Sequence, residues 1–219
     1  MLTSELPLWA REAAHRAVLY RRYPKLALGI AHSRGYERQL REPHDSYVAQ
    51  VSDRANAASI ELAGMLWGIC ERLRPRRLID LGSGFSSYVI RAWAQQHGAE
   101  SWSVDTSVEW LERTREYLSG AGVSSEHLLL WDDFLAHPPG DFDLLLHDLG
   151  GMGMRALTLP SVLSVVAPGG VVVLDDMHKD PYHPLVVQEL DRRGWRLFNL
   201  SWRTTDTFGR YAAVTVRPS

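Results

Sequence analysis

The stretch Arg77-Leu-Ile-Asp-Leu-Gly-Ser-Gly84 decides the fold of this chain. Its apolar start predicts a short buried strand, and Gly82 and Gly84 predict a tight turn at the carboxyl end of that strand. The residues from Ser86 to His97 then have the pattern of a helix, which Gly98 would end in the left-handed conformation. A strand, a glycine turn and a helix in this order form the first part of a βαβ unit.

Strand and helix patterns alternate downstream of this unit. Further strands are predicted at 101–105, 126–131, 142–147, 171–174, 196–201 and 211–216. Helices are predicted between most of them, one of which would begin at a capping box of Thr106 and Glu109. This alternation predicts an α/β fold with a doubly wound, mostly parallel sheet of seven strands. No helix is predicted between the last two strands, so we expect an antiparallel C-terminal hairpin at one edge of the sheet.

The first 51 residues differ in charge from the rest of the chain. Eight Lys or Arg lie between residues 11 and 41, against two Glu. A loose helical spacing, interrupted by Pro24, predicts one or two helices outside the sheet. We therefore expect an N-terminal helical extension or lid at 1–51 and a main domain at 52–219 that opens with a helix at 52–73. The aromatic residues of the extension would suit a contact in a homodimer: Trp9, Tyr20, Tyr23 and Tyr36.

The basic residues of the extension have two interpretations. They suit the solvated face of a docked helix, or a contact with nucleic acid or an anionic substrate. The formal net charge of the whole chain is -2. That charge gives no overall attraction to nucleic acid or to an anionic membrane, so neither is the expected partner.

The composition is that of an ordinary globular protein. Of the 219 residues, 45% are hydrophobic and 23% are charged, which excludes a disordered or fibrous chain. The single cysteine, Cys70, cannot form an internal disulfide or, by itself, a thiolate metal site. The start of the chain lacks the order of a signal peptide, and no stretch reaches the roughly 20 apolar residues of a membrane helix. These features predict a soluble cytoplasmic protein.

The glycine turn and a later acid indicate a nucleotide-like ligand. In a doubly wound sheet, ligands bind beyond the carboxyl ends of the strands, where Asp80, Gly82 and Gly84 are expected. Asp105 follows at the tip of the next strand, about 20 residues further on, and a carboxylate there can accept both hydroxyls of a ribose. Nicotinamide and flavin sites usually have a third glycine where this chain has Ser87. Asp80 suits a cationic amino group better than a pyrophosphate.

On these residues the chain resembles the class I S-adenosylmethionine (SAM)-dependent methyltransferases, which have a Rossmann-like fold. The segment Ile79 to Gly84 resembles their first motif, and Val104-Asp105 resembles their second. The segment Trp131 to Phe134 is similar to their third motif, which contacts adenine. The strand at 142–147 and the turn at 167–170 resemble the corresponding parts of their fourth and fifth strands.

The resemblance covers about residues 56–217 and implies that SAM is the cofactor. The glycine turn would shape the pocket for the methionine part, Asp80 would hold the ammonium directly or through a water, and Asp105 would bind the ribose. Asp132 or Asp133 would accept the adenine amino group, with Asp133 favoured, although both suit a solvated turn as well. The residues expected at the cofactor are Asp80, Gly82, Ser83, Gly84, Ser86, Asp105, Thr106, Asp132, Asp133 and Asp148.

Three aspartates form a second group. Asp148 ends the fourth predicted strand, and Asp175 and Asp176 end the fifth. The tips of neighbouring strands lie about 4.8 Å apart, so three carboxylates would repel one another unless a cation lies among them. Oxygen ligands at a site open to water suit Mg²⁺. We therefore expect a Mg²⁺ site of these three residues; the alternative is that two of them cap neighbouring helices.

The aspartates also resemble the metal site of the catechol-type and antibiotic-sugar O-methyltransferases. The catechol-type enzymes end the fifth strand with Asp-Asn, and here Asp176 stands in the Asn place. They have a lysine base three residues after the fourth-strand aspartate, where this chain has Gly151. Another base is therefore expected, and the candidates are His147, His178, Lys179 and His183. We favour His178 and Lys179 as catalytic residues and interpret His147 as structural.

These features favour a metal-assisted O-methyltransferase that acts on a small-molecule hydroxyl. The glycine-rich segment 150–154 would then be a loop over the substrate, or alternatively the entry to a helix. The alternative function is a metal-independent N- or RNA-methyltransferase that uses the basic N-terminal segment. A nicotinamide-binding or non-enzymatic domain is disfavoured by Ser87 and by the hairpin at the end of the chain. No motif identifies the acceptor.

Overall fold

One seven-stranded sheet forms the centre of the molecule. The computed structural model describes residues 8–219, with side chains from residue 13 onward. The strands are β1 (Arg77–Leu81), β2 (Glu100–Asp105), β3 (Leu128–Leu130), β4 (Phe142–His147), β5 (Val166–Leu174), β6 (Phe198–Asn199) and β7 (Ala213–Val216). Their order is β3-β2-β1-β4-β5-β7-β6, and only β7 runs antiparallel to its neighbours. The predicted mostly parallel sheet with an antiparallel C-terminal hairpin is confirmed.

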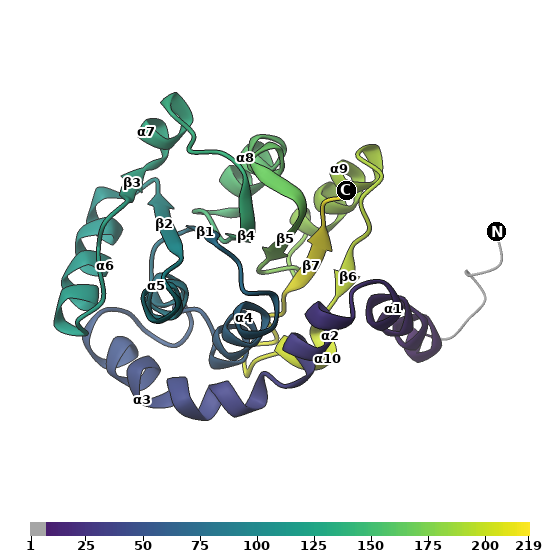
Figure 1. The fold of residues 1–219 in the computed structure, drawn as a ribbon, viewed down its shortest axis with the longest axis horizontal. Coiled ribbons are helices and arrows are strands. Elements are labelled where there is room, and N and C mark those ends of the chain that lie inside the picture. The colour runs from purple at the N-terminus through teal and green to yellow at the C-terminus, as the bar shows by residue number, and fades with distance from the viewer. Residues whose placement is uncertain (1–7) are drawn as a thin grey trace.

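Helices cover both faces of this sheet (Figure 1). Over the described residues they are α1 (Leu8–Arg22), α2 (Pro24–Ala31), α3 (Arg34–Gln50), α4 (Ile60–Leu73), α5 (Phe85–His97), α6 (Val108–Gly120), α7 (Trp131–Ala136), α8 (Met152–Ser164), α9 (Tyr182–Arg192) and α10 (Ser201–Thr204). In Figure 1, α4 and α5 lie on one side of the sheet, and α8 and α9 lie on the other. None of these helices has both the length and the apolar character that crossing a membrane requires.

Successive strand residues pack into two different cores. In β4, Leu144 and Leu146 pack with α4 and α5, whereas Leu145 packs with α8 and α9. In β5, Val173 and Val172 divide in the same way. A strand that is buried on both faces needs apolar side chains at every position, which explains the unbroken apolar runs in these two strands.

Three helices, rather than the one or two expected, precede α4. Pro24 stands at the start of α2, where its missing N–H breaks no helical hydrogen bond. α2 packs closely on α4 because Gly29 and Gly68 face each other: a Cβ on Gly29 would lie 2.6 Å from the carbonyl oxygen of Gly68. Ile30 and Leu40 join the core beneath α4. The division of the chain at residue 51 stays a prediction.

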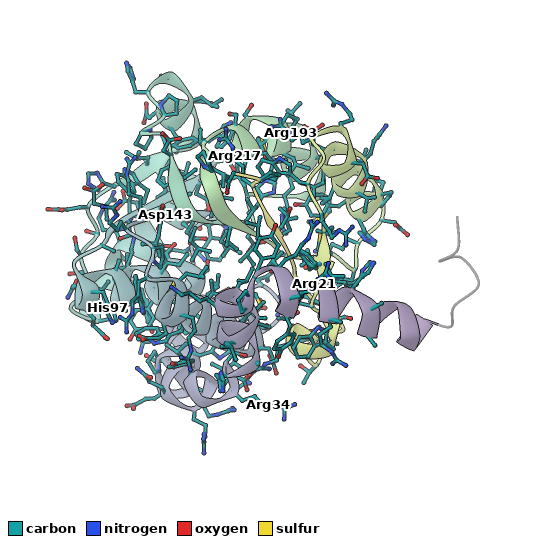
Figure 2. The ribbon with its side chains drawn as sticks, turned by 45° about the vertical axis from the view of Figure 1, so that its right-hand side comes forward. Arg21, Arg34, His97, Asp143, Arg193 and Arg217 are labelled. Carbon is teal, nitrogen blue, oxygen red and sulfur yellow. The ribbon has the colours of Figure 1, made fainter. Side chains whose placement is uncertain are left out.

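The described basic side chains of the N-terminal segment, from Arg16 to Arg41, lie at its surface. Figure 2 shows Arg21 and Arg34 on α1 and α3, and both are exposed. This placement agrees with the interpretation of a solvated basic face and leaves these residues free to contact an anion.

The aromatic residues that we expected at a homodimer contact have different surroundings. Tyr23 packs edge-on against Phe198, with ring centroids 5.9 Å apart, and Tyr36 packs against the core of its own chain. Tyr20 is exposed, and the side chain of Trp9 lies outside the described residues. The homodimer stays a prediction.

Several element boundaries differ from the predicted ones. α4 begins at Ile60 rather than residue 52, because the Ser59 hydroxyl accepts a hydrogen bond from an amide of the first turn at 3.1 Å. α6 is capped in the same way by Ser107 at 3.2 Å, so the capping residue is not Thr106. β5 begins at Val166, five residues before the expected start, because Val166 is already paired with Phe142 of β4.

Candidate functional site

A cavity of about 360 Å³ opens at the carboxyl ends of β1, β2 and β4, and we call it the first cavity. From β1 the strand order runs through β2 and β3 on one side, and it continues with β4 on the other side. The cavity therefore lies at the switch point, where doubly wound sheets bind ligands. Seven of the residues expected at the cofactor line it: Gly82, Ser83, Gly84, Ser86, Asp105, Thr106 and Asp148.

Asp105 is held by neutral donors at the wall of the first cavity. One carboxylate oxygen accepts hydrogen bonds from the backbone N–H and the hydroxyl of Ser83, at 2.6 and 2.8 Å. The other accepts from the backbone N–H of Ser107 at 2.9 Å. These bonds fix the orientation of the carboxylate without cancelling its charge. Its remaining lone pairs can accept hydrogen bonds from a diol.

Gly82 lets two strand ends meet behind the cavity. Its φ of 109° belongs to a region that side-chain-bearing residues avoid, and a Cβ there would lie 2.3 Å from the carbonyl oxygen of Asp148. The backbone N–H of Asp148 donates to Leu81 at 2.7 Å, which joins the end of β4 to the end of β1. The glycine is therefore required for this close approach.

Asp80 lies behind the glycine turn and does not line the first cavity. It is fully buried, and one of its oxygens accepts from the hydroxyls of Ser86 and Ser87, at 3.0 and 2.6 Å. Its other oxygen has no partner among the described residues. Burial raises the pKa of Asp80 to about 7. Ser87 therefore binds this carboxyl from the position where a third glycine would stand, and the expected contact of Asp80 with an ammonium stays a prediction.

Asp132 and Asp133 are not brought to the first cavity. Both lie in the first turn of α7, are exposed and do not line it. The short helix was not predicted; it begins directly after β3 and turns these carboxylates toward solvent. Their expected contact with adenine stays a prediction.

A second cavity of about 260 Å³ adjoins the first. Asn56, Ala57, Ala58, Asp148, Gly150, Gly151 and Arg155 line both cavities. Asp175, Asp176 and Lys179 line only the second, together with Arg210. The three aspartates predicted from their strand ends are therefore brought together. The segment after Asp148 leads into α8, as its second interpretation expected.

The residues around the aspartates do not fit a divalent metal ion. The guanidinium of Arg155 lies between Asp148 and Asp176: its Nη2 pairs with Asp148 Oδ1, and its Nη1 lies 3.2 Å from Asp176 Oδ2. Lys179 Nζ lies 2.7 Å from the same Oδ2. In the described part of the chain, no three His, Cys, Asp or Glu side chains are arranged to hold a metal ion. The Mg²⁺ site expected from the sequence is not supported, because fixed cations already neutralise two of its carboxylates.

Burial has a strong effect on the pKa values of two of these carboxyl groups, those of Asp148 and Asp175. It raises the pKa of Asp148 well above the usual range, while Arg155 acts in the opposite direction. Burial and the neighbouring Asp176 raise the pKa of Asp175 to about 6. Among the described residues, Asp148 and Asp176 form ion pairs and Asp175 forms none, so Asp175 is the one of the three carboxyl groups without a cation partner.

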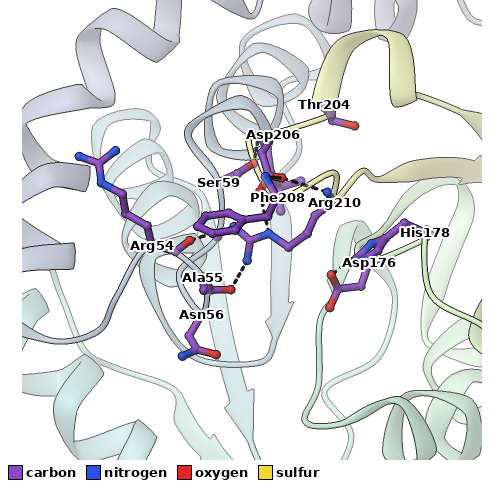
Figure 3. Close-up of polar contacts among 12 residues, drawn as sticks. Arg54, Ala55, Asn56, Ser59, Asp176, His178, Thr204, Asp206, Phe208 and Arg210 are labelled. Atoms are coloured by element: carbon purple, nitrogen blue, oxygen red, sulfur yellow. Dashed lines mark hydrogen bonds and ion pairs between the residues drawn. The ribbon is translucent and has the colours of Figure 1, made fainter.

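The candidate bases occupy different places. Lys179 lines the second cavity, whereas His178 does not; the His178 ring lies beside Asp176, with 3.6 Å between Nδ1 and Oδ1 (Figure 3). His183 lines neither cavity. His147 is fully buried between the hydroxyls of Tyr182 and Thr158, at 2.9 and 3.2 Å, and burial lowers its pKa to about 3. These contacts agree with its interpretation as structural.

Three features of the site were missed in the sequence. Tyr47 of α3 lines the first cavity although it belongs to the N-terminal segment. The segment 55–58, expected to be helical, lines the second cavity as a loop. Arg155 lies seven residues after Asp148. The sequence argument that the three aspartates need a cation could have pointed to this arginine.

The loop at 55–58 is held by the C-terminal region (Figure 3). Arg210 donates to the carbonyl oxygens of Ala55 and Arg54, at 2.5 and 3.1 Å. Its Nε also donates to Asp206 at 2.6 Å. One arginine therefore joins the wall of both cavities to the segment that precedes β7.

Comparisons with known proteins point to the same fold. No protein-family model matches the chain. Over 145 residues it is 27% identical to the trans-aconitate 2-methyltransferase of Paracidovorax citrulli (strain AAC00-1), a match that covers 64% of this chain and 51% of that protein. The chain thus spans about half the length of this curated relative.

Two solved structures resemble almost the whole chain. The O-methyltransferase TomG from Streptomyces achromogenes, involved in tomaymycin synthesis and in complex with SAM, matches with a TM-score of 0.56 and 17% identity, over 86% of this chain and 90% of TomG. An O-methyltransferase from Bacillus cereus in complex with SAH matches with a TM-score of 0.60 and 11% identity, over 96% and 97%. With its strand order and its first cavity, this chain has the fold of the class I SAM-dependent methyltransferases.

Proposed function

We propose that the protein is a SAM-dependent methyltransferase that acts on a hydroxyl group of a small molecule. The observation that carries this proposal is the pair of adjoining cavities. The first is lined by Asp105, which we expect to bind the ribose, and by a glycine turn beside it, and the second holds polar side chains suited to an acceptor. Because the two cavities share lining residues, a cofactor bound in the first would lie next to an acceptor bound in the second.

The cofactor supplies an electrophilic methyl group on a sulfonium. In our proposal the chain's own residues bind and orient: Asp105 accepts hydrogen bonds from the ribose hydroxyls, and the turn at Gly82 and Gly84 leaves room for the methionine part. Holding both reactants in line accounts for a large part of the rate of such transfers. No step passes through a metal ion, because Arg155 and Lys179 already neutralise two of the three aspartates.

The second cavity supports a small acceptor that donates a hydrogen bond. Its volume of about 260 Å³ suits a small molecule. The unpaired carboxyl group of Asp175 can accept a hydrogen bond from a hydroxyl. The solved neighbours from Streptomyces and Bacillus are O-methyltransferases, which agrees with this proposal. His178 and Lys179 stay predictions as bases: Lys179 lines the cavity but is paired as a cation with Asp176, and the His178 ring lies beside the same carboxylate.

Ligand binding and methyl transfer test the proposal separately. Calorimetric titration with SAM, SAH and NADH should give binding of the first two and not of NADH. Transfer of a labelled methyl group should then be measured over a panel of small hydroxyl compounds, with and without a chelator, and it should persist in the chelator. Preferential binding of NADH would exclude the methyltransferase; transfer only to RNA, falling steeply with salt, would favour the alternative that uses the basic N-terminal segment.

A further inference from the structure

The second cavity brings three carboxyl groups close together, and an arginine side chain lies among them. Asp148 and Asp176 are brought together by the ends of β4 and β5, and Asp175 lies beside them. Carboxylates held this close in a partly dry site repel one another unless a cation compensates them. Arg155 supplies that cation from α8, and its side chain is only 7% exposed.

The backbone holds Arg155 in this place. Its Nε donates to the carbonyl oxygen of Gly150 at 3.1 Å, so the side chain folds back over the turn that precedes its own helix. Nη2 pairs with Asp148, and Nη1 faces Asp176 at 3.2 Å. Three nitrogen atoms of one planar group are thus directed at fixed partners, which suits arginine and would not suit lysine.

Nη1 also keeps donor capacity. It is buried and has no hydrogen-bond partner among the described residues, since its contact with Asp176 lacks hydrogen-bond geometry. Arg155 lines both cavities. The residue is therefore part of the lining of both cavities, while its Nη1 atom stays buried beside Asp176.

We propose that the Arg155 guanidinium is the resident cation of the second cavity and occupies the place that a divalent metal ion would otherwise take among Asp148, Asp175 and Asp176. Arg155 is then a positioning residue. It lies between the carboxylates and compensates their charge, so the cavity does not need a metal ion for this purpose. The inference concerns the proposed methyltransferase site, but it is a statement about charge and stands whether or not the acceptor is a hydroxyl.

The chain contains a matched control for this inference. Arg203 is also buried, at 7% exposure, and pairs with a carboxylate, but its only such partner among the described side chains is Glu37. Removing Arg155 leaves three clustered carboxylates with Lys179 beside Asp176 as their remaining cation, whereas removing Arg203 leaves one carboxylate. A new metal site is therefore expected in the first case and not in the second.

Binding of Mn²⁺, followed by electron paramagnetic resonance and by the shift of the thermal unfolding midpoint, tests this. The wild type and Arg203→Met should show no stoichiometric site. Arg155→Met should bind one Mn²⁺ at least tenfold more tightly than the wild type and gain thermal stability from it. Asp175→Asn in the Arg155→Met background should weaken that binding again. A wild type that binds Mn²⁺ stoichiometrically and loses it on Asp175→Asn would overturn the proposal, as would an Arg155→Met protein that folds and gains no site.

A folding failure would not leave the matter open. If Arg155→Met does not fold in metal-free buffer, refolding with Mn²⁺ should rescue it, and failure of that rescue counts against the proposal. Titration of the wild type with SAM is a separate experiment. If the wild type does not bind SAM, the proposed function is contradicted, but the assignment of Arg155 as the cation of the second cavity is not affected.

Discussion

The two halves of the site hold their carboxylates in different ways. At the ends of β1 and β2, Asp80 and Asp105 accept hydrogen bonds from hydroxyls and backbone amides, all of them neutral. At the ends of β4 and β5, Asp148 and Asp176 are paired with Arg155 and Lys179. In the first half neutral donors orient the carboxyl groups, and in the second half cations compensate them.

This difference matches what each half would bind. Asp105, which neutral donors orient at the wall of the first cavity, keeps free lone pairs and can bind the hydroxyls of a ligand. A carboxylate paired with a buried arginine has little left to offer a metal ion, and its pairing depends on both partners being present. Four substitutions break or sharpen the comparison, and their expected effects decrease in the order given.

Arg155→Met should have the largest effect, because it leaves buried carboxylates without their cation. Breaking a buried pair by removing one partner costs about 3–5 kcal/mol. We expect the free energy of unfolding, measured in urea without added metal, to fall by roughly that amount. Lys179→Met removes the more exposed cation of the same cluster, at 40% exposure, and should cost clearly less. Equal losses for both variants would show that Arg155 has no special place.

Asp80→Asn should change how stability depends on pH. The pKa of Asp80 is about 7 in the folded chain and 3.8 in the unfolded chain, so the native state binds more protons between these values. The wild type should therefore lose stability as the pH rises from 4 to 7, on the order of 3 kcal/mol from this group. The Asn variant should lack this loss.

The measurement is urea unfolding of both proteins without cofactor at several pH values between 4 and 8. The difference between wild type and Asp80→Asn isolates the contribution of Asp80, since all other groups titrate in both proteins. A difference that does not change with pH would mean that Asp80 is ionised throughout this range in the folded protein.

Asp105→Ala should weaken SAM binding at least tenfold, if the proposed function holds. Charge-assisted hydrogen bonds to the ribose contribute about 1.5–3 kcal/mol, and 1.4 kcal/mol corresponds to a factor of ten. Titration calorimetry measures the affinity directly. Asp132→Ala and Asp133→Ala belong in the same series, because a weakening by only one of them would identify the adenine contact. An unchanged affinity for Asp105→Ala would remove the ribose assignment.

Arg210→Met should have the smallest effect on stability, about 1–2 kcal/mol, because it removes two hydrogen bonds to backbone carbonyls and one partly buried ion pair. The segment 53–58 should then exchange its amide hydrogens faster. Arg54→Met is the matched control, since Arg54 forms an exposed pair with Asp45 that is worth less than about 1 kcal/mol. Unchanged exchange in Arg210→Met would mean that the loop is held by other contacts.

Part of the site could be predicted from the sequence because the patterns that indicate it lie within short segments. Gly82, Ser83 and Asp105 lie at the ends of two consecutive strands, and they line one cavity as expected. The gathering of Asp148, Asp175 and Asp176 was also readable, since it needs only that β4 and β5 are neighbours. The identity of their counter-ion was not, because a metal ion and an arginine satisfy the same charge argument.

Other residues could not be placed without the packing of the helices. Tyr47 reaches the first cavity only because α3 folds back against the rest of the chain, with the Tyr47 ring 5.6 Å from that of Phe85. Asp132 and Asp133 were placed by motif resemblance, but α7 begins immediately after β3 and leaves both of them exposed.

The amino-acid sequence by itself determined the doubly wound sheet, the glycine turn and the acid at the tip of β2, because hydrophobic periodicity and turn chemistry are properties of short segments. Only the tertiary structure decided which charges meet. Arg210 contacts Ala55 across 155 positions of the chain, and Arg155 of α8 meets Asp176 in the segment that follows β5. The physical reason is that long side chains reach partners chosen by packing, and no local pattern records how two distant segments come together.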